Sequence, residues 1–322
     1  MPFSLAADGK YCLTGGHDRT VRLWNPSRLD PAYPPVDLPP HPSDPDTIPI
    51  DALPRALPIQ TYGDGFTHPV TAVAIDKEST SLLAASDQTL VVTDVVTKQV
   101  KRRFQGHVGR INAVAVSEKC ETYVSASYDA TVRIWDGRSR SYEPVQIFKE
   151  AKDSVTSVHI VQDDGLAFIR TAAVDGSVRT YDLRMGEIRC DNFGSSITSM
   201  APTHDGECLA VSCLDGTIRL MELKSGELLN TYDSHHAAGQ YGLECCLTSD
   251  DAAIISGSED GRVVLYDLVR ATRVQALQGH TRATCSIAAH PKRECSSVVI
   301  SASFDGSAVV WANDADFMQW QD

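Results

Sequence analysis

The sequence has 322 residues, of which 42% are apolar, enough to fill a large core and to exclude a wholly disordered chain. Lys and Arg total 29 against 42 Asp and Glu, and the net charge of −13 disfavours sequence-independent binding to nucleic-acid phosphates. No stretch approaches the roughly 18 apolar residues that a membrane helix requires, and the first residues lack the basic and apolar regions of a signal peptide. We therefore expect a soluble intracellular protein.

Nine cysteines are spread along the chain without a CxxC motif. A zinc site needs clustered ligands, and a disulfide framework is typical of short secreted chains. We expect the cysteines to be small apolar packing residues in a reducing compartment. The sequence thus predicts neither a metal site nor a cofactor.

One pattern recurs seven times: a small or polar pair, an Asp, and then a strand of alternating apolar residues that ends at an aromatic position. The seven turn aspartates are Asp18, Asp87, Asp129, Asp175, Asp215, Asp260 and Asp305. Successive copies lie 69, 42, 46, 40, 45 and 45 residues apart. A period of about 40–45 residues with four strands per repeat is typical of WD-repeat propellers.

The repeat has a physical basis. Asp followed by Gly or another polar residue forms the tight turn between two antiparallel strands. The residues three and five positions after each Asp are nearly all apolar, as at Val132 and Ile134, so they give the sheet an apolar face. Such sheets cannot bury their faces alone, and a closed ring leaves only short, protected edges. We predict an all-β fold: one seven-bladed WD-repeat β-propeller over residues 1–322. Whether the closing blade has all four strands is left open.

Blade one is interrupted by a proline-rich, acidic insertion, predicted at residues 26–56. Eleven of the sixteen prolines lie from Asn25 to Pro58. Proline lacks a backbone donor and fixes φ, so this stretch cannot form a central strand, and residues 57–62 follow as the delayed outer strand. We expect an extended surface loop, with a ligand for a proline-reading domain as the alternative.

The two ends leave ring closure open. Only Pro2 to Ala6 precede the Asp8–Gly9 turn to serve as the inner strand of blade one, and eleven residues follow Trp311. We expect that blade seven lacks its outer strand or that residues 317–320 take its place. A shortened N-terminus is an equally good explanation.

Two repeats carry a Gly-His pair upstream of the turn, at residues 106–107 and 279–280. Here the sequence resembles the WD-repeat family, in which such a His, a strand Ser or Thr, the turn Asp and the Trp form a buried hydrogen-bonded chain. The resemblance implies two structural networks: His107, Ser125, Asp129 and Trp135 in blade three, and His280, Ser301, Asp305 and Trp311 in blade seven. A His–Ser–Asp set also invites a hydrolase interpretation. We reject it because the set repeats in two blades and no GxSxG motif is present.

Arginines stand four residues after the turn Asp at positions 22, 133, 179 and 219. They share a strand face with the aromatic position two residues later, within the packing between blades. We expect local stacking or ion pairing, with a basic binding groove as the alternative.

One rim of a propeller carries the turns between second and third strands and the loops that lead into each first strand. The residue before each turn Asp should face this rim, and two of these are large aromatics of the kind enriched at binding hot spots. Arginines that follow the two Gly-His pairs should lie nearby. The predicted partner-binding rim contains His17, Tyr128, Phe304, Arg110 and Arg282. Scattered exposed aromatics without a role are the alternative.

Some segments are not required by the propeller repeat, notably RSRSYEPVQ (138–146) and YDLRMGE (181–187). With similar runs in nearly every blade, they resemble the mitogen-activated protein kinase organiser family, a group of WD-repeat scaffolds. The long insertion and the short N-terminal segment depart from that family. The resemblance implies assembly of kinase-cascade components, membership of the spliceosome, and cytoplasmic and nuclear residence. We expect protein partners, no direct contact with nucleic acid or membrane, and a monomer outside its complexes.

Two other classes of function compete with the scaffold. Residues 135–138 and 181–184 resemble the WDxR motif of substrate receptors for a cullin-4 ubiquitin ligase, which implies that Arg138 and Arg184 dock the ligase adaptor. An enzyme is the third class, and the sequence shows no paired carboxylates, phosphate loop or metal cluster. We therefore expect a non-catalytic scaffold.

Overall fold

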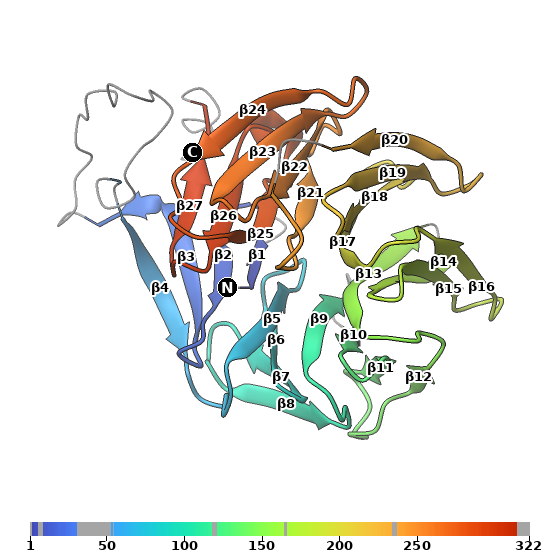
Figure 1. Cartoon of the computed structure of the whole chain (residues 1–322). Helices are drawn as coiled ribbons and strands as arrows, with labels where there is room; N and C mark the ends of the chain where they lie inside the picture. Colours follow the sequence, from blue (N-terminus) through green and yellow to red (C-terminus); the bar gives the residue numbers. More distant parts are fainter. Residues whose placement is uncertain are drawn as a thin grey trace.

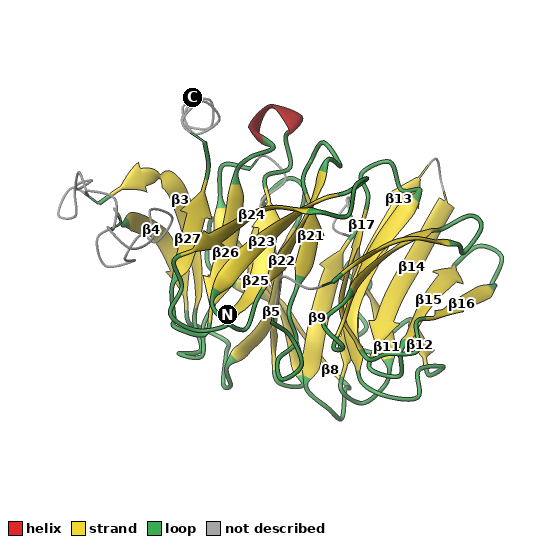
Figure 2. Cartoon of the chain, turned by 45° about the horizontal axis from the view of Figure 1, so that its top comes forward, coloured by secondary structure: helices red, strands yellow, loops and turns green. Residues whose placement is uncertain are grey.

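The computed structural model describes residues 2–5, 9–30, 53, 55–117, 121–163, 166–233 and 237–313. Their strands form seven antiparallel sheets arranged in a ring (Figure 1). This confirms the predicted seven-bladed β-propeller. Turns and loops gather along two rims at opposite ends of the sheets (Figure 2).

Each blade is a simple up-and-down sheet whose strands follow one another in chain order. Blades one and two contain β1 (Phe3–Leu5), β2 (Cys12–Gly15), β3 (Val21–Leu29), β4 (Ala56–Tyr62), β5 (Val70–Ile75), β6 (Ser81–Ser86), β7 (Thr89–Asp94) and β8 (Val100–Gln105). Blades three and four contain β9 (Ile111–Val116), β10 (Thr122–Ser127), β11 (Val132–Asp136), β12 (Gln146–Phe148), β13 (Val155–Asp163), β14 (Leu166–Ala173), β15 (Ser177–Asp182) and β16 (Ile188–Asn192).

Blades five to seven complete the ring. They contain β17 (Ile197–Pro202), β18 (Cys208–Cys213), β19 (Ile218–Glu222), β20 (Leu228–Tyr232), β21 (Cys245–Leu247), β22 (Ala253–Gly257), β23 (Arg262–Asp267), β24 (Arg273–Gln278), β25 (Thr284–Ala289), β26 (Val299–Ser303) and β27 (Ala308–Trp311). A short 3-10 helix, η2 (Arg293–Cys295), lies between β25 and β26. The first strand of each blade lies nearest the axis, and β1 packs between β5 and β25 to close the ring (Figure 1).

The core lies between neighbouring blades. Every residue of β6 is buried, whereas β16 on the outside is mostly exposed. Phe104 on the outer strand of blade two packs against Trp135 of blade three, with ring centroids 5.2 Å apart. Because each sheet is apolar on both faces, its free energy of burial depends on both neighbours.

Polar residues on the inner strands also join the blades. The pairing register of several inner strands shifts near its start, which is the geometry of a β-bulge. At these points Thr156 Oγ1 donates to the Ile197 carbonyl oxygen at 3.0 Å, and Thr198 Oγ1 donates to the Leu243 carbonyl oxygen at 2.9 Å. Asn112 Nδ2 makes the equivalent bond into blade four at 2.8 Å. Each of these bonds crosses from one blade to the next.

Blade one differs from its prediction at the insertion boundary. Strand β3 continues to Leu29, past the predicted start of the insertion at residue 26, and Leu29 pairs with Ala56 on β4. Pro26 is accommodated because the register shifts between Trp24 and Leu29, so the missing N–H breaks no regular ladder bond. Residues 31–52 lie outside the described residues. The predictions that they form a surface loop or a ligand for a proline-reading domain therefore stay predictions.

Blade seven has three strands among the described residues, β25, β26 and β27. In that part of the chain, β27 pairs with β26 and with no outer strand. The prediction that residues 317–320 supply this strand falls on residues outside the described ranges.

Candidate protein-binding rim

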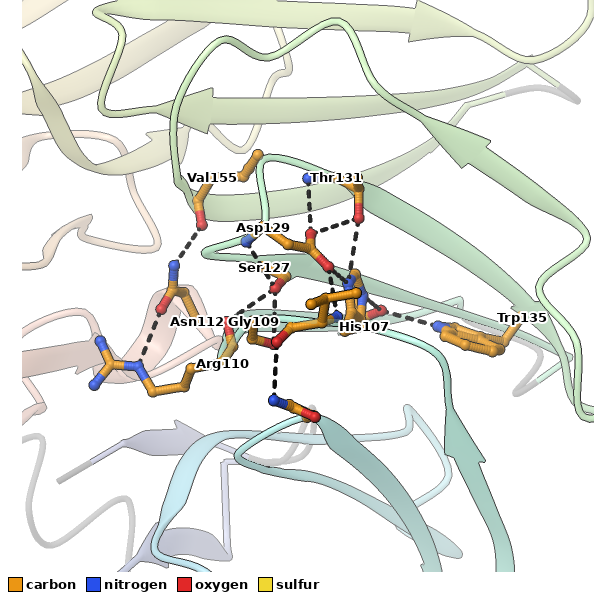
Figure 3. A network of polar contacts seen from close by, with 12 residues as sticks. His107, Gly109, Arg110, Asn112, Ser127, Asp129, Thr131, Trp135 and Val155 are labelled. Atoms are coloured by element: carbon orange, nitrogen blue, oxygen red, sulfur yellow. Dashed lines mark hydrogen bonds and ion pairs between the residues drawn. The ribbon is translucent and has the colours of Figure 1, made fainter.

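Blade three contains a buried chain of four polar side chains beneath the rim (Figure 3). Trp135 Nε1 donates to Ser125 Oγ at 2.9 Å, Ser125 Oγ lies 2.8 Å from His107 Nε2, and His107 Nδ1 lies 2.9 Å from Asp129 Oδ2. A carboxylate only accepts, so Nδ1 carries the imidazole proton and Nε2 accepts the Ser125 hydroxyl proton. The direction of donation therefore runs from Trp135 to Asp129, and every member is satisfied.

Electrostatics favours this protonation state. Burial lowers the pKa of His107, and the contact with Asp129 offsets only part of that effect. Burial acts to raise the pKa of Asp129, but hydrogen bonds from Thr131, His107 and the Val108 N–H hold it well below its usual range. The blade thus holds a neutral imidazole beside a carboxylate, in which a fully satisfied network fixes geometry.

Blade seven repeats the arrangement. Trp311 Nε1 donates to Ser301 Oγ at 2.8 Å, His280 Nε2 lies 2.8 Å from the same Oγ, and His280 Nδ1 lies 3.2 Å from Asp305 Oδ2. Both serines have no exposed surface, so neither can meet a substrate. The structure therefore brings together all eight residues of the two predicted networks. Their hydrogen bonds join the strands and turns of one blade and so stabilise its fold.

The networks also hold the rim loops. Asp129 Oδ2 accepts a hydrogen bond from the Val108 N–H, and Asp305 Oδ2 accepts one from the Thr281 N–H, both at 3.0 Å. These two loops carry Arg110 and Arg282, the predicted rim arginines. The position of each exposed arginine thus depends on a partly buried aspartate.

A third Trp network in blade one was missed by the sequence analysis. Trp24 Nε1 donates to Thr14 Oγ1 at 2.8 Å. The spacing could have revealed it, because Thr14 lies four residues before Asp18 and Trp24 six after, as Ser125 and Trp135 do around Asp129. In this blade the turn aspartate, Asp18, forms an ion pair with Arg22.

The arginines four residues after the turn Asp form ion pairs with it in three blades. Arg179 binds Asp175 at 2.7 Å and Arg219 binds Asp215 at 2.6 Å, as Arg22 binds Asp18. Arg133 in blade three is the exception, since His107 already occupies the turn aspartate there. The contacts are local pairs within a blade, as the sequence analysis expected, rather than a groove.

The five predicted rim residues, His17, Tyr128, Phe304, Arg110 and Arg282, are all exposed. Tyr128 and Phe304 expose 67% and 48% of their surface. The Tyr128 N–H donates to the Arg110 carbonyl oxygen at 2.8 Å, which joins the Tyr128 turn to the loop that carries Arg110. His17 lies in blade one and makes no such link to the other four among the described residues.

The rule that placed these residues fails at one position. Ser86 was expected to face the rim, but it is 3% exposed and bonds to the main chain of His68. Its small hydroxyl fits inside the turn, where Tyr128 cannot.

Tyr241 is a further rim residue that the sequence analysis missed. It lies in the loop that leads into β21, is 46% exposed, and its ring centroid is 5.4 Å from that of Phe304. Glu259 Oε1 accepts hydrogen bonds from the Gln240 and Tyr241 N–H groups and fixes this loop. The position of Tyr241 before a first strand was the available signal. Tyr241, Phe304 and Tyr128 with Arg110 form what we call the aromatic rim.

The two predicted adaptor-docking arginines lie on the opposite rim, in turns between third and fourth strands. The Arg138 side chain is 71% exposed and lies 3.4 Å from Glu121. Arg184 is exposed in the equivalent turn of blade four. The aromatic rim and these arginines are therefore separate surfaces.

Within the described ranges no cluster of three His, Cys, Asp or Glu residues is arranged to hold a metal ion. No helix in that part of the chain has the length and apolar character to cross a membrane.

Comparison with known proteins matches the repeat itself. The model of the WD domain, G-beta repeat matches residues 3–25, 98–136 and 271–312, which are the segments that contain Trp24, Trp135 and Trp311. The model of the anaphase-promoting complex subunit 4 WD40 domain matches residues 179–248.

Among similar proteins, the WD repeat domain-containing protein 83 homolog of Dictyostelium discoideum is 28% identical over 331 residues, covering 95% of this chain and 92% of the relative. WD repeat domain-containing protein 83 of Rattus norvegicus is 40% identical over 177 residues, 55% of this chain and 53% of the relative. The Homo sapiens protein of that name is 37% identical over 177 residues, which again cover 55% of this chain and 53% of the relative. The matches to the two mammalian relatives thus span about half of their length.

Proposed function

We propose, from the premise that the chain is a WD-repeat propeller, that it is a non-catalytic scaffold that assembles protein complexes through its aromatic rim. The supporting observation is the exposure of Tyr128, Tyr241 and Phe304 on loops that are each held by a hydrogen bond from the residue's own N–H. Large aromatics and arginines are enriched among the residues that dominate binding free energy. Fixed loops also lose little conformational entropy when a partner binds.

The finer proposal is a scaffold of kinase-cascade components that also belongs to the spliceosome, resident in the cytoplasm and the nucleus. Its support is the resemblance of residues 138–146 and 181–187, which the propeller repeat does not require, to the mitogen-activated protein kinase organiser family. The net charge of −13 favours protein contacts over direct contacts with RNA.

Affinity purification with quantitative mass spectrometry tests both levels. The wild-type chain is compared with a Tyr128→Ala/Phe304→Ala variant, in moderate salt with and without RNase. We expect the variant to lose most co-purifying proteins. Spliceosomal proteins retained after RNase support the splicing role, and kinases alone support the signalling role.

A matched control keeps the test specific. Val96 and Val269 are each 81% exposed in turns on the opposite rim, so Val96→Ala/Val269→Ala removes similar apolar surface elsewhere. We expect this variant to retain the partners. Equal retention by both double variants contradicts the rim proposal.

A second candidate is a substrate receptor of a cullin-4 ubiquitin ligase, favoured by the exposure of Arg138 on the opposite rim. We expect the ligase adaptor to co-purify and to be lost on Arg138→Ala/Arg184→Ala, while the Tyr128→Ala/Phe304→Ala variant retains it. Absence of the adaptor from the wild-type sample contradicts this candidate.

A further inference from the structure

A pocket of about 260 Å³ lies on the rim opposite the aromatic rim, where the inner strands of blades three to five end. Val116, Ile160, Val161 and Pro202 form apolar walls, and His204 lies at its edge with 44% of its side chain exposed. The pocket is smaller than most small-molecule sites and has the size of one side chain with its surroundings.

Arg170 lines this pocket and is only 7% exposed. Its Nε and Nη1 atoms are enclosed, and no described residue accepts a hydrogen bond from either. Burial lowers the pKa of Arg170, as expected for a cation removed from water. A buried guanidinium without an anion destabilises the folded chain, so its place in a pocket calls for a ligand.

Polar groups near Arg170 make hydrogen bonds to other residues. His159 is the register partner of Arg170, and its Nε2 lies 2.9 Å from the Met200 carbonyl oxygen. Asp251 lies 3.3 Å from His204 Nδ1 and accepts from the His204 N–H. The Asp251 carboxylate therefore binds His204 rather than Arg170.

We propose that this pocket binds the carboxylate of one Asp or Glu side chain of a partner protein, with Arg170 as the binding residue. The planar guanidinium fork matches a carboxylate, and the apolar walls suit the methylene groups that carry it. The net charge of −13 disfavours polyanions such as nucleic acid at this rim. The inference rests on the proposed scaffold function and adds a second contact surface to it.

The first experiment uses small carboxylates as probes. Thermal unfolding of the full chain is followed in glutarate, phosphate and chloride at equal ionic strength. Glutarate should raise the Tm of the wild type and leave that of Arg170→Met unchanged, while in chloride Arg170→Met should be as stable as the wild type or more so. A control, Arg262→Met, changes a half-exposed arginine on the aromatic-rim side and should keep the glutarate response.

Other results overturn the proposal. Strong destabilisation by Arg170→Met in chloride would show that the guanidinium has a structural partner. Stabilisation by phosphate but not by glutarate would assign a different anion. If Arg170→Met fails to fold, Val161→Phe fills the pocket and leaves Arg170 in place, and it should also lose the glutarate response.

A second experiment distinguishes a protein carboxylate from a free one. Peptides that bind the full chain are selected from a random library, and their binding to Arg170→Met and to Tyr128→Ala/Phe304→Ala is measured. We expect a class that contains a required Asp or Glu, binds Arg170→Met about tenfold or more weakly, and binds the aromatic-rim variant normally. Recovery of no such class overturns the pocket proposal alone, because loss of partners through Tyr128 and Phe304 is measured separately.

Discussion

Ser125 shows how much one hydroxyl supports at the residue scale. It accepts from Trp135 Nε1 and donates to His107 Nε2, and it is fully buried. Thr14 serves a single described partner, Trp24, in blade one. The hydroxyl at this position of the repeat therefore contributes more hydrogen bonds in blade three than in blade one.

Ser125→Ala should lower the free energy of unfolding by about 2–4 kcal/mol, because it leaves a buried donor and a buried acceptor unpaired. Thr14→Val should cost about 1 kcal/mol, since it leaves only the partly exposed Trp24 donor. Urea unfolding of the two variants beside the wild type measures the difference. Equal costs would mean that the blade-three chain is not formed.

The network histidines should make stability depend on pH. Burial lowers the pKa values of His107 and His280 below their ordinary value of 6.5, so the unfolded chain binds more protons below that pH. Stability should be full above about pH 6.5 and fall as the pH drops. The network aspartates, Asp129 and Asp305, have pKa values below their ordinary 3.8. Their contribution to stability is therefore lost only when the pH falls below about 3.8.

Urea unfolding at pH 7.5 and 5.5 should therefore show a larger loss in the wild type than in His107→Gln/His280→Gln. His159, whose pKa burial also lowers, leaves some dependence in the variant. An identical loss in both proteins would contradict the neutral-imidazole assignment.

At this scale much of the site followed from the sequence, because spacing around the turn Asp is fixed by strand pairing. The resemblance to the WD-repeat family then implied the network of His107, Ser125 and Trp135. The position of Tyr241 before a first strand was a signal for the rim, but its contact with Phe304 in another blade could not be predicted. Arg170 could not be predicted either, since its pocket is shared by three blades. Periodicity along the chain carries no information about such contacts.

The partner of the turn Asp differs between blades. In blades one, four and five, an arginine four residues after the turn Asp occupies the place that histidine takes in blades three and seven. The burial of these pairs varies: the Arg179 and Asp175 side chains are 6% and 9% exposed, whereas those of Arg22 and Asp18 are 34% and 44% exposed. Burial should decide what each pair contributes.

Arg179→Met should cost about 3 kcal/mol, because it leaves Asp175 enclosed without its cation. Arg22→Met should cost less than about 1 kcal/mol, because water replaces the lost contact. Chemical denaturation of both variants tests this contrast. A larger cost for Arg22→Met would contradict the role assigned to burial.

The edge of blade seven makes a second prediction for elements. Since β27 pairs on one side among the described residues, its outward amides should exchange faster than those of the third strand of an enclosed blade. Hydrogen exchange should show faster labelling of residues 308–311 than of β11. Equal protection would show that another segment covers β27.

The insertion shows where element boundaries escape sequence analysis. Proline at position 26 suggested that β3 stops there, yet the strand continues to Leu29 across an irregular register. Composition detects a change of character along the chain, but only the partner strand decides where pairing ends.

For the whole molecule, the ring follows from sheets that are apolar on both faces, so blade number and strand order were predictable from seven turn aspartates. Function was less accessible, because the repeat fixes the scaffold while the partner contacts lie on loops. The two rims have different chemistry: aromatics and arginines on one, and a buried cation in an apolar pocket on the other. This division suits a protein that holds two partners at once.

Photo-crosslinking tests the central claim most directly. Benzoylphenylalanine in place of Tyr128 should crosslink to a partner protein in cell extract, and the crosslink should disappear when Tyr241→Ala/Phe304→Ala is added. The same reagent in place of Val269 on the opposite rim should not give that product. Crosslinks to the partner from position 269 and none from position 128 would contradict the aromatic rim as the binding surface.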